Sequence, residues 1–211
     1  MARKSPDSQV LKSTVKSGVL PLQAHFDRFN DFHGHELIRR LIEFIGDDPT
    51  REGVLDTPKR VVKSYKELFG GYWKSPEAVL GTTFEGSGYD QMVICKDIEF
   101  YSTCEHHLIT FMGKVHIGYV PGKRVVGLSK LARLVEVFAR RLQIQEKMTQ
   151  QIADAIWKVL KPKGVMVVVE AKHLCMCGRG VQKQHSSMVT SSIKGVFNRP
   201  EARAEFMTLI K

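Results

Sequence analysis

The sequence predicts an α+β protein in which pairs of helices alternate with pairs of strands. Two observations predict it. The spacing of apolar residues changes back and forth between the helical period and strand-like alternation, and glycines and prolines separate the two kinds of segment. The predicted order is αα, ββ, αα, ββ, without an internal repeat. This order indicates one main domain with a smaller N-terminal addition.

The N-terminal third of the chain divides into an arm and a helical region. Residues 1–33 carry scattered Ser, Lys, Asp and Pro with weak apolar periodicity, which predicts a flexible basic arm. Apolar residues at helical spacing within 37–45 predict a short helix. Thr57, followed by proline, is expected to be the N-cap of a second helix that ends at a glycine pair. We therefore expect a helical hairpin within residues 34–90.

Residues 91–211 are expected to form the main domain. β-Branched and aromatic residues predict its strands, and the helical period returns between them. The predicted elements are strands at 92–100 and 109–120, a helix capped by Ser129, a helix from about Gln145, strands at 165–171 and 187–197, and a closing helix from Pro200.

Composition excludes several classes of protein. The chain has 211 residues, 43% of them hydrophobic and 26% charged, as is usual for a globular protein. It contains no apolar stretch of the ~18 residues that a membrane helix needs, and the N-terminus has no apolar signal core. We expect a cytoplasmic protein, in which the four cysteines are thiols or metal ligands rather than disulfides.

Charge points to a polyanionic partner. The net charge is +10 and the sequence pI about 9.5. Nucleic acid, an acidic surface and a phosphorylated small molecule are all compatible with this charge. A basic surface turned to water is the simpler alternative, and composition does not choose among them.

Two segments at strand ends contain residues that bind zinc. Cys104 and His107 lie where the first predicted strand ends, and Cys175 follows the strand at 165–171. A catalytic zinc site keeps three protein ligands and an open fourth position, whereas a structural site fills all four. Cys177 is a possible fourth ligand, because in an extended segment it points to the same side as Cys175. Reduced, packed cysteines remain the alternative.

Two histidines outside the proposed ligand set stand out, and four others are assigned no role. His106 and His173 flank the proposed ligands, and they are candidates for proton donors and acceptors or for support of the ligands. Of the four others, His116 is expected to be a satisfied sheet residue, and His25, His33 and His35 are expected to be solvated.

A cluster of cations suits a triphosphate. Backbone N–H groups at a helix N-terminus favour anions, and basic or hydroxyl side chains accompany one such terminus and the second cysteine segment. They are Ser129, Lys130, Arg133 and Arg179. A charged face turned to water is the alternative. Gln145 and Glu146 could pair with a guanine edge, whose N–H groups match a carboxylate.

Taken together, these segments resemble the GTP cyclohydrolase I family from about Arg51 to the C-terminus. The motifs are Arg51-Glu52-Gly53, Asp56 to Val61, Ser102 to His107, Gly127 to Lys130, Gln143 to Glu146, and His173-Leu174-Cys175. The resemblance implies the tunnelling fold, of order ββααββ, with sheets from several subunits joined into a barrel. It also implies a toroidal homodecamer with active sites at subunit interfaces. The implied reaction converts GTP and water into 7,8-dihydroneopterin triphosphate and formate, the first step toward folates or tetrahydrobiopterin.

The resemblance also implies a role for individual residues. Cys104, His107 and Cys175 match the Zn²⁺ ligands. His173 matches the histidine that protonates the imidazole ring of guanine. His106 matches a second catalytic histidine near the ribose. Ser129 is also expected to be a catalytic residue. Ser129, Lys130, Arg133 and Arg179 match triphosphate contacts, and Arg60 matches one from a neighbouring subunit. Gln145 and Glu146 match the guanine-binding pair, with Glu105 beside them.

Parts of the sequence are compatible with three other functions. A zinc nucleobase deaminase would carry H-x-E before P-C-x-x-C, and this chain has neither element. A nitrile reductase of the tunnelling fold uses NADPH and a lone cysteine without zinc, which the C-x-x-H and H-x-C segments argue against. A basic nucleic-acid-binding protein is allowed by the charge alone. We expect GTP rather than nucleic acid or a membrane as the partner, and the sequence is silent on whether a regulatory protein binds.

Overall fold

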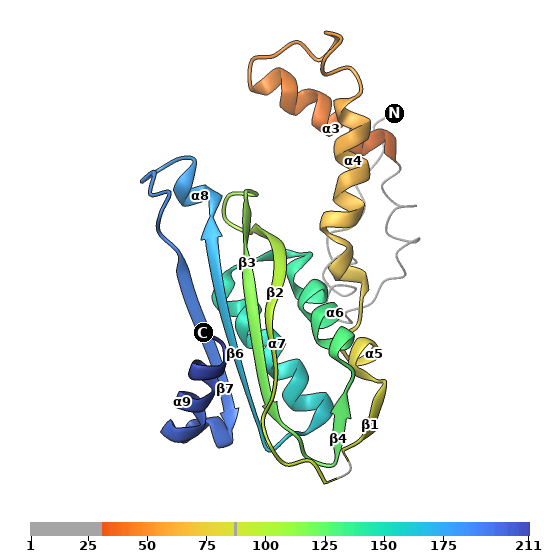
Figure 1. Cartoon of the computed structure of the whole chain (residues 1–211). Coiled ribbons are helices and arrows are strands. Elements are labelled where there is room, and N and C mark those ends of the chain that lie inside the picture. The colour runs from red at the N-terminus through yellow and green to blue at the C-terminus, as the bar shows by residue number, and fades with distance from the viewer. Residues whose placement is uncertain (1–30, 87) are drawn as a thin grey trace, which may run out of the picture. The chain divides into compact units, whose positions relative to one another are not determined.

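The structure is a computed structural model that describes residues 31–86 and 88–211 (Figure 1). The chain separates into two compact units, the first ending at Trp73 and the second running from Lys74 to Lys211. Most of the predicted arm, including His25, lies outside the described residues.

The first unit contains the predicted pair of helices, α3 (Asp31–Phe44) and α4 (Thr57–Leu68), followed by the short helix η1 (Gly70–Trp73). The two long helices approach closely at Gly34, where a Cβ atom would lie 2.9 Å from Val62 Cγ2. The prediction that Thr57 is the N-cap is wrong by one residue. Asp56 occupies that position and Thr57 is the first helical residue, because Pro58 fits equally well one residue further into the first turn.

Most of the apolar residues that predicted α3 are exposed in the single chain. Ile42 is buried, with 6% of its surface accessible, but four others are exposed: Leu37, Leu41, Phe44 and Ile45. The spacing therefore predicted the helix correctly, while the first unit alone does not cover its apolar face.

A five-stranded sheet forms the second unit, with the strand order β5-β2-β3-β6-β7. Its strands are β2 (Val93–Cys104), β3 (Thr110–Val120), β5 (Leu142–Gln143), β6 (Gly164–His173) and β7 (Met188–Gly195). The four long strands pair antiparallel, and they confirm the four predicted strands to within a few residues. Two three-residue strands, β1 (Thr83–Glu85) and β4 (Arg124–Val126), form a separate pair that was too short to predict.

Helices cover one face of this sheet (Figure 1). They are α5 (Pro76–Leu80), α6 (Leu128–Ala139) and α7 (Gln145–Leu160), and their apolar sides pack with the sheet into the main core. Ser129 does not cap α6 as predicted. Gly127 is the N-cap residue, with extended backbone, and the exposed Ser129 is the second residue of the helix.

The other face is covered only at one end. There, the closing helix α9 (Pro200–Leu209) and the short helix η2 (Val196–Asn198) place Phe206 and Phe197 against Met166 and Val168. A Cβ atom on Gly118 would lie 2.5 Å from the Phe206 ring, so this glycine lets α9 approach β3. The first six residues of β6, Gly164 to Val169, are thus buried on both faces, which explains their continuous apolar run.

None of the helices in the described residues is long and apolar enough to cross a bilayer. The main unit has the order ββααββ in its long elements, with β2, β3, α6, α7, β6 and β7 following one another along the chain.

Candidate metal centre and active site

Three predicted ligands meet at one end of the sheet. The ligand atoms of Cys104, His107 and Cys175 all lie within 4.8 Å of one another, and Cys104 Sγ is 3.7 Å from His107 Nδ1. Cys104 is buried, Cys175 is half-buried and His107 is exposed. The three side chains are therefore close enough to hold one ion, and the imidazole side of the group is exposed to solvent.

Sheet topology brings these distant residues together. Strand β3 lies between β2 and β6 and pairs with both, so the end of β2, which carries Cys104, and the end of β6 meet beside the start of β3. Cys175 follows in the one-turn helix α8 (Leu174–Cys177). A tight turn returns the chain from β2 to β3, with Leu108 in the left-handed region at φ 55° and its N–H bonded to Cys104 O.

The donor set fits a soft divalent cation. Burial raises the pKa of the Cys175 thiol, and negative charge on Cys104 raises it further, so two thiolates side by side are unfavourable without a cation. A bound cation removes this repulsion. Two sulfurs and one imidazole are ligands that Zn²⁺ prefers.

Cys177 does not join the three ligands. Residues 174–177 are helical rather than extended, so the prediction that Cys175 and Cys177 point to the same side is wrong. The Cys177 thiol instead donates to Lys183 O at 3.4 Å. Within residues 31–86 and 88–211, the metal-binding group contains only the other two sulfurs and the imidazole.

His173 is held beside this group by two contacts. Its Nε2 lies 2.9 Å from Gln145 Oε1, and its ring stacks on Phe111 with centroids 4.7 Å apart and planes inclined by 1°. Burial lowers the pKa of His173, and the charge of Glu146 partly opposes this shift. Sequence reasoning missed Phe111, because only the β3–β6 register places it opposite His173.

Gln145 is fully buried, which the sequence did not predict for a residue expected to contact guanine. Its Nε2 lies 3.0 Å from Val169 O, 3.0 Å from Met188 O and 3.1 Å from Thr190 Oγ1. The side-chain amide is therefore engaged within the protein.

Other predicted residues lie close to the metal-binding group in sequence and structure. His106 is exposed in the same turn, with its ring edge-on to that of His107 at 6.2 Å between centroids. Glu105 accepts from Lys147 Nζ at 3.4 Å, and its backbone N–H donates to Gln143 O. Glu146 is exposed in the first turn of α7, and Arg179 is exposed just beyond α8, where its charge acts to lower the pKa of Cys175.

The predicted phosphate-binding turn lies at the opposite end of the sheet. The Val126 N–H, just before α6, donates to the hydroxyl of Tyr119 at 3.3 Å. Tyr119 is eight residues along β3 from Phe111, which is about 27 Å in an extended strand. The C-terminal end of α6 lies near the end of the sheet that carries the metal-binding group, here called the metal end. There, Gln143 Nε2 donates to Phe138 O at 3.0 Å. Ser129 and Lys130, in the first turn of α6, therefore lie at the end of the sheet opposite the metal-binding group of their own chain, and Arg133 follows one turn later.

Arg60 belongs to the first unit, where it lies on α4. Its guanidinium pairs with Asp56 at 3.4 Å, and both side chains are largely exposed. The phosphate contact predicted for Arg60 involves a neighbouring subunit, so it stays a prediction.

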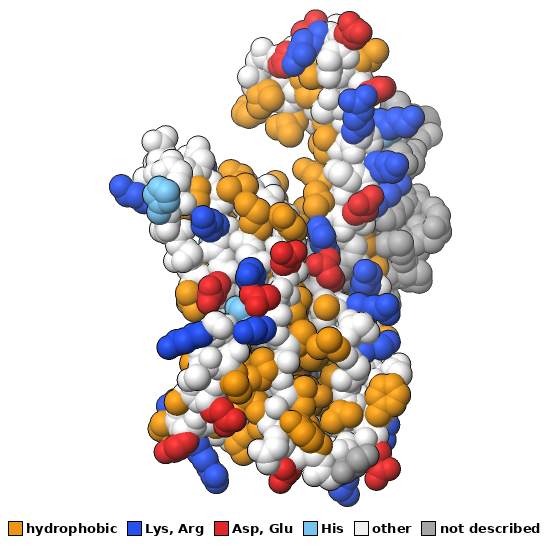
Figure 2. Space-filling view, viewed as in Figure 1, with side chains coloured by type: hydrophobic (Ala, Val, Ile, Leu, Met, Phe, Trp, Pro, Cys, Tyr) orange, Lys and Arg blue, Asp and Glu red, His pale blue; other side chains and the backbone are white. Residues whose placement is uncertain are grey.

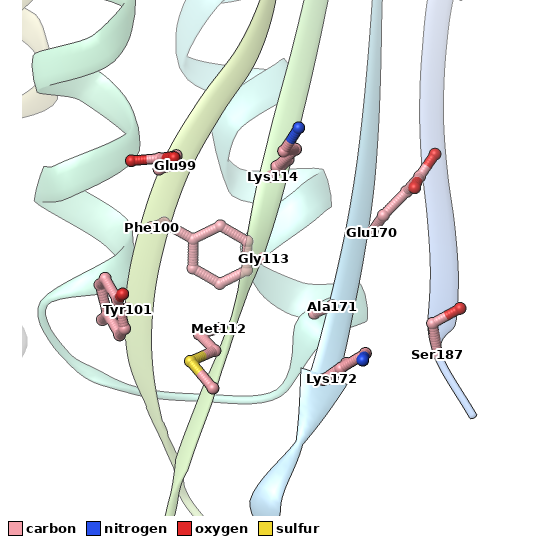
Figure 3. A pocket seen from close by; sticks show the side chains of 10 residues that line it. All are labelled: Glu99, Phe100, Tyr101, Met112, Gly113, Lys114, Glu170, Ala171, Lys172 and Ser187. Atoms are coloured by element: carbon pink, nitrogen blue, oxygen red, sulfur yellow. The ribbon is translucent and has the colours of Figure 1, made fainter. Parts of the chain in front are cut away.

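The uncovered face of the sheet carries mixed charge (Figure 2). A recess of about 450 Å³ opens there, on β2, β3, β6 and the start of the segment leading into β7 (Figure 3). Glu99, Lys114 and Glu170 lie directly opposite one another across three strands, an arrangement of alternating charges that stabilises the sheet. The recess is lined by none of the predicted site residues, so it is not the metal centre.

His116 is a buried sheet residue, as predicted, with 4% of its surface accessible. Its Nδ1 accepts the N–H of Asp97 at 3.2 Å, at an irregularity in β2 where Asp97 has φ 59°. Burial lowers the pKa of His116.

Fold and site together define an α+β protein with two thiols and an imidazole that could hold a metal ion at the end of a mixed sheet. The sequence model of the family described as GTP cyclohydrolase I matches residues 35–211. A protein named GTP cyclohydrolase 1 from Wolinella succinogenes is 62% identical over 177 residues, which cover 83% of this chain and 95% of that protein. One of the same name from Brucella suis is 50% identical over 211 residues, covering 97% of this chain and 99% of the relative.

The chain therefore belongs to the GTP cyclohydrolase I family, as the sequence motifs predicted. Its order of elements and curled sheet agree with the tunnelling fold of that family. A solved structure of the archaeosine synthase QueF-Like in the apo form overlaps 49% of this chain and 93% of that one. Its TM-score is 0.39 with 14% identity, too slight a likeness to inform the fold further.

Proposed function

We propose that this chain opens the imidazole ring of the guanine of GTP by hydrolysis, and that recyclisation gives 7,8-dihydroneopterin triphosphate with release of formate. The observation that carries the proposal is the cluster of Cys104, His107 and Cys175 beside His173, in a chain of this family. This is the first step toward folates or tetrahydrobiopterin, and we place it in the cytoplasm, where thiols stay reduced.

Zn²⁺ is the metal we propose for the three ligands. A zinc ion held by three protein atoms supplies Lewis acidity, which lowers the pKa of water from ~16 toward ~7. The exposed side of His107 leaves room for water and substrate, which supports a catalytic rather than a structural site.

The protein's own residues supply the protons. C8 of guanine is a poor electrophile, and we propose that His173 delivers a proton to N7 so that C8 accepts a nucleophile. Its half-buried ring, stacked on Phe111, is held in one plane for this transfer. The exposed His106 serves as a second proton donor and acceptor, near the ribose that rearranges into the new ring.

We propose that the guanine is held by the carboxylate of Glu146, with Gln145 and Glu105 in support. A carboxylate accepts two parallel N–H bonds from the guanine edge, and Glu146 is exposed in the first turn of α7, one residue from the partner of His173. Glu105, next to Cys104 in the chain, forms an ion pair with Lys147 of the same helical turn as Glu146.

The triphosphate does not react, and it serves to hold the ring over the metal. Arg179 is available for this role at the metal end. We propose that Ser129, Lys130 and Arg133 act on the nucleotide held by a different copy of the chain, because α6 begins at the end of the sheet opposite the metal-binding group. Ser129 then aids the reaction by orientation, and Arg60 contributes from a neighbouring subunit.

Two features support assembly into a ring, and we propose a homodecamer. Within the described residues, β5 covers only Thr103 and Cys104 of β2, and the outer edge of β7 has no partner. Unpaired edges of this length are templates for further pairing, so β2 of one copy can join β7 of the next into a continuous barrel. The exposed apolar residues of α3 offer a second contact between copies.

Incubation of the purified, zinc-loaded protein with GTP tests the function. We expect formate in equal amount to the GTP consumed, and a fluorescent pterin after oxidation of the product. A protein that only binds nucleic acid would produce neither. Formate without pterin would indicate ring opening without recyclisation, and the proposed product would then be wrong.

A further inference from the structure

Gln145 belongs to a hydrogen-bond network in which the donor and the acceptor of each bond can be assigned. Thr149 Oγ1 donates to Gln145 O at 2.7 Å, as threonines inside helices commonly do. The 2.7 Å bond between the hydroxyls of Thr149 and Thr190 therefore uses the proton of Thr190. Thr190 Oγ1 is then left to accept from Gln145 Nε2.

The orientation of the Gln145 amide follows from its neighbours. Val169 O and Met188 O are backbone carbonyls, which accept and never donate, and each lies 3.0 Å from Nε2. A flipped amide would place Oε1 against both carbonyl oxygens in a buried site, where acceptor would face acceptor and neither contact could be a hydrogen bond. The amide nitrogen therefore faces β6 and β7, and the amide oxygen faces His173.

This orientation decides which nitrogen of His173 carries a proton. Gln145 Oε1 only accepts, so the 2.9 Å contact requires a hydrogen on His173 Nε2. In the part of the chain that the structure describes, no protein group is bonded to Nδ1 of this ring. The stack on Phe111 fixes the plane of the ring, so both its tilt and its tautomer are set by the protein.

We propose that Gln145 is a positioning residue that keeps His173 protonated on Nε2, so that Nδ1 is the nitrogen that exchanges a proton with the substrate. The inference rests on the proposed function, in which His173 acts on the purine, and it refines the role of Gln145. Its buried amide acts through His173, and the guanine contact falls to the exposed Glu146.

A direct test reads the tautomer in the whole, metal-loaded wild-type protein. Histidine labelled with ¹³C and ¹⁵N is incorporated, and magic-angle-spinning spectra are recorded at a pH above the ordinary titration range of histidine. The signals of His173 are those missing from a His173→Gln variant. We expect the protonated nitrogen to correlate with Cδ2, which is bonded to Nε2. A protonated nitrogen that correlates with Cγ, which is bonded to Nδ1, overturns the proposal.

A pair of matched variants tests the consequence. Gln145→Met removes the acceptor at nearly constant volume, and Gln143→Met makes the same change at another buried glutamine, whose amide donates to Phe138 O and Gln151 Oε1 and does not contact His173. We expect Gln145→Met to lower kcat by about 10- to 100-fold, with KM changed less than about threefold, and to lose the Nε2–H signature. Gln143→Met should keep that signature and lower kcat far less.

Each alternative has its own result. A loss in Gln145→Met that lies in KM alone would mean that the amide binds the base directly, which overturns the proposal. Equal losses of kcat in the two variants would make Gln145 an ordinary core residue, which overturns it as well. If Gln145→Met does not fold, the wild-type spectrum decides alone. If the wild type releases no formate, the proposed function fails, whereas the tautomer is still read from the spectrum.

Discussion

The two ends of the main sheet are built in opposite ways. At one end, Cys104, His107, Cys175 and His173 come from two distant segments, and buried hydrogen bonds and ring stacking hold them within one chain. At the other end, Lys130 and Arg133 lie within one helical turn with their neighbour Ser129. The residues of the first end come together within one chain, whereas the cations of the second end lie at the start of α6, away from that group.

The two ends differ because metal binding and proton transfer need more accurate geometry than phosphate binding does. Proton transfer and metal binding need geometry accurate to a fraction of an ångström, which a packed sheet end provides. Phosphate binding needs charge and N–H groups, which a helix N-terminus offers wherever assembly places it. Changes at the metal end should therefore abolish chemistry, and changes at the α6 end should weaken binding.

The largest effect is expected from Cys175→Ser. A serine hydroxyl is a poor ligand for zinc, so the protein should lose its metal, and formate release should fall by more than about 10³-fold. Metal content by elemental analysis and turnover are measured on the same samples. Normal zinc with full activity would contradict the ligand assignment.

Cys177→Ser is the matched control for that change. Cys177 lies in the same turn of helix, but its thiol donates to Lys183 O. We expect zinc content to stay normal and turnover to change less than about twofold, since the lost contact is a weak thiol hydrogen bond. Loss of zinc in this variant would place the second sulfur ligand at Cys177.

His173→Ala tests the chemistry at the same end without touching a ligand. General acid–base catalysis contributes about 10²- to 10⁴-fold, so turnover should fall by that factor while zinc stays bound. Ring opening is followed by formate release, and metal by elemental analysis. A rate equal to that of the wild type would remove the acid role of this residue.

The α6 end should show an effect on GTP binding rather than on turnover. Lys130→Ala combined with Arg133→Ala removes two cations, and each charge-assisted bond contributes about 1.5–3 kcal/mol. We expect KM for GTP to rise by 100-fold or more, on the order implied by those energies, while kcat changes little. A fall in kcat at unchanged KM would assign these residues to the reacting centre instead.

Mixed assemblies of a metal-end variant and an α6 variant test whether one active site uses residues from two copies of the chain. When subunits of Cys175→Ser and of the Lys130→Ala, Arg133→Ala double variant are co-assembled, about a quarter of the sites should combine two intact halves if each site draws on two copies. Activity at low GTP should then exceed that of either parent. No recovery after verified co-assembly would mean that both ends serve the same chain's site.

The sequence predicted the metal end better than its supporting contacts. Thiols and imidazole at strand ends are recognisable in one dimension, and so Cys104, His107 and Cys175 were identified before the fold was known. The stack of Phe111 on His173 depends on the β3–β6 register, which spacing does not specify.

Local geometry explains the remaining differences. The helical turn at 174–177 follows β6 directly, with no glycine or proline between them to signal the end of the strand. An extended segment was therefore expected, and the prediction that Cys177 points to the same side as Cys175 was wrong. Polarity suggested that Gln145 contacts a ligand, yet its carbonyl partners on β6 and β7 are backbone atoms, which leave no trace in the sequence. The long helices and strands were predictable because their apolar periods extend over many residues.

The smallest effect is expected midway between the two ends, at His116. Burial lowers its pKa from the usual 6.5, so just below that pH the unfolded chain binds more protons than the folded one. Stability carried by the neutral ring is therefore present above about pH 6.5 and is lost as pH falls toward the lowered pKa. The charges of Asp97, Glu170, Lys114 and Lys96 also act on this imidazole, and the two carboxylates oppose the shift.

His116→Gln removes the titration and keeps an acceptor for the Asp97 N–H. We expect the fall in Tm between about pH 7 and pH 5 to be smaller in this variant than in the wild type, by roughly 2–4 °C. His185→Gln, at an exposed loop position, is the control and should follow the wild-type curve. Because His116 touches neither end, turnover at neutral pH should stay within about twofold. A Tm profile identical to that of the wild type would show that the buried imidazole does not govern the acid limb of stability.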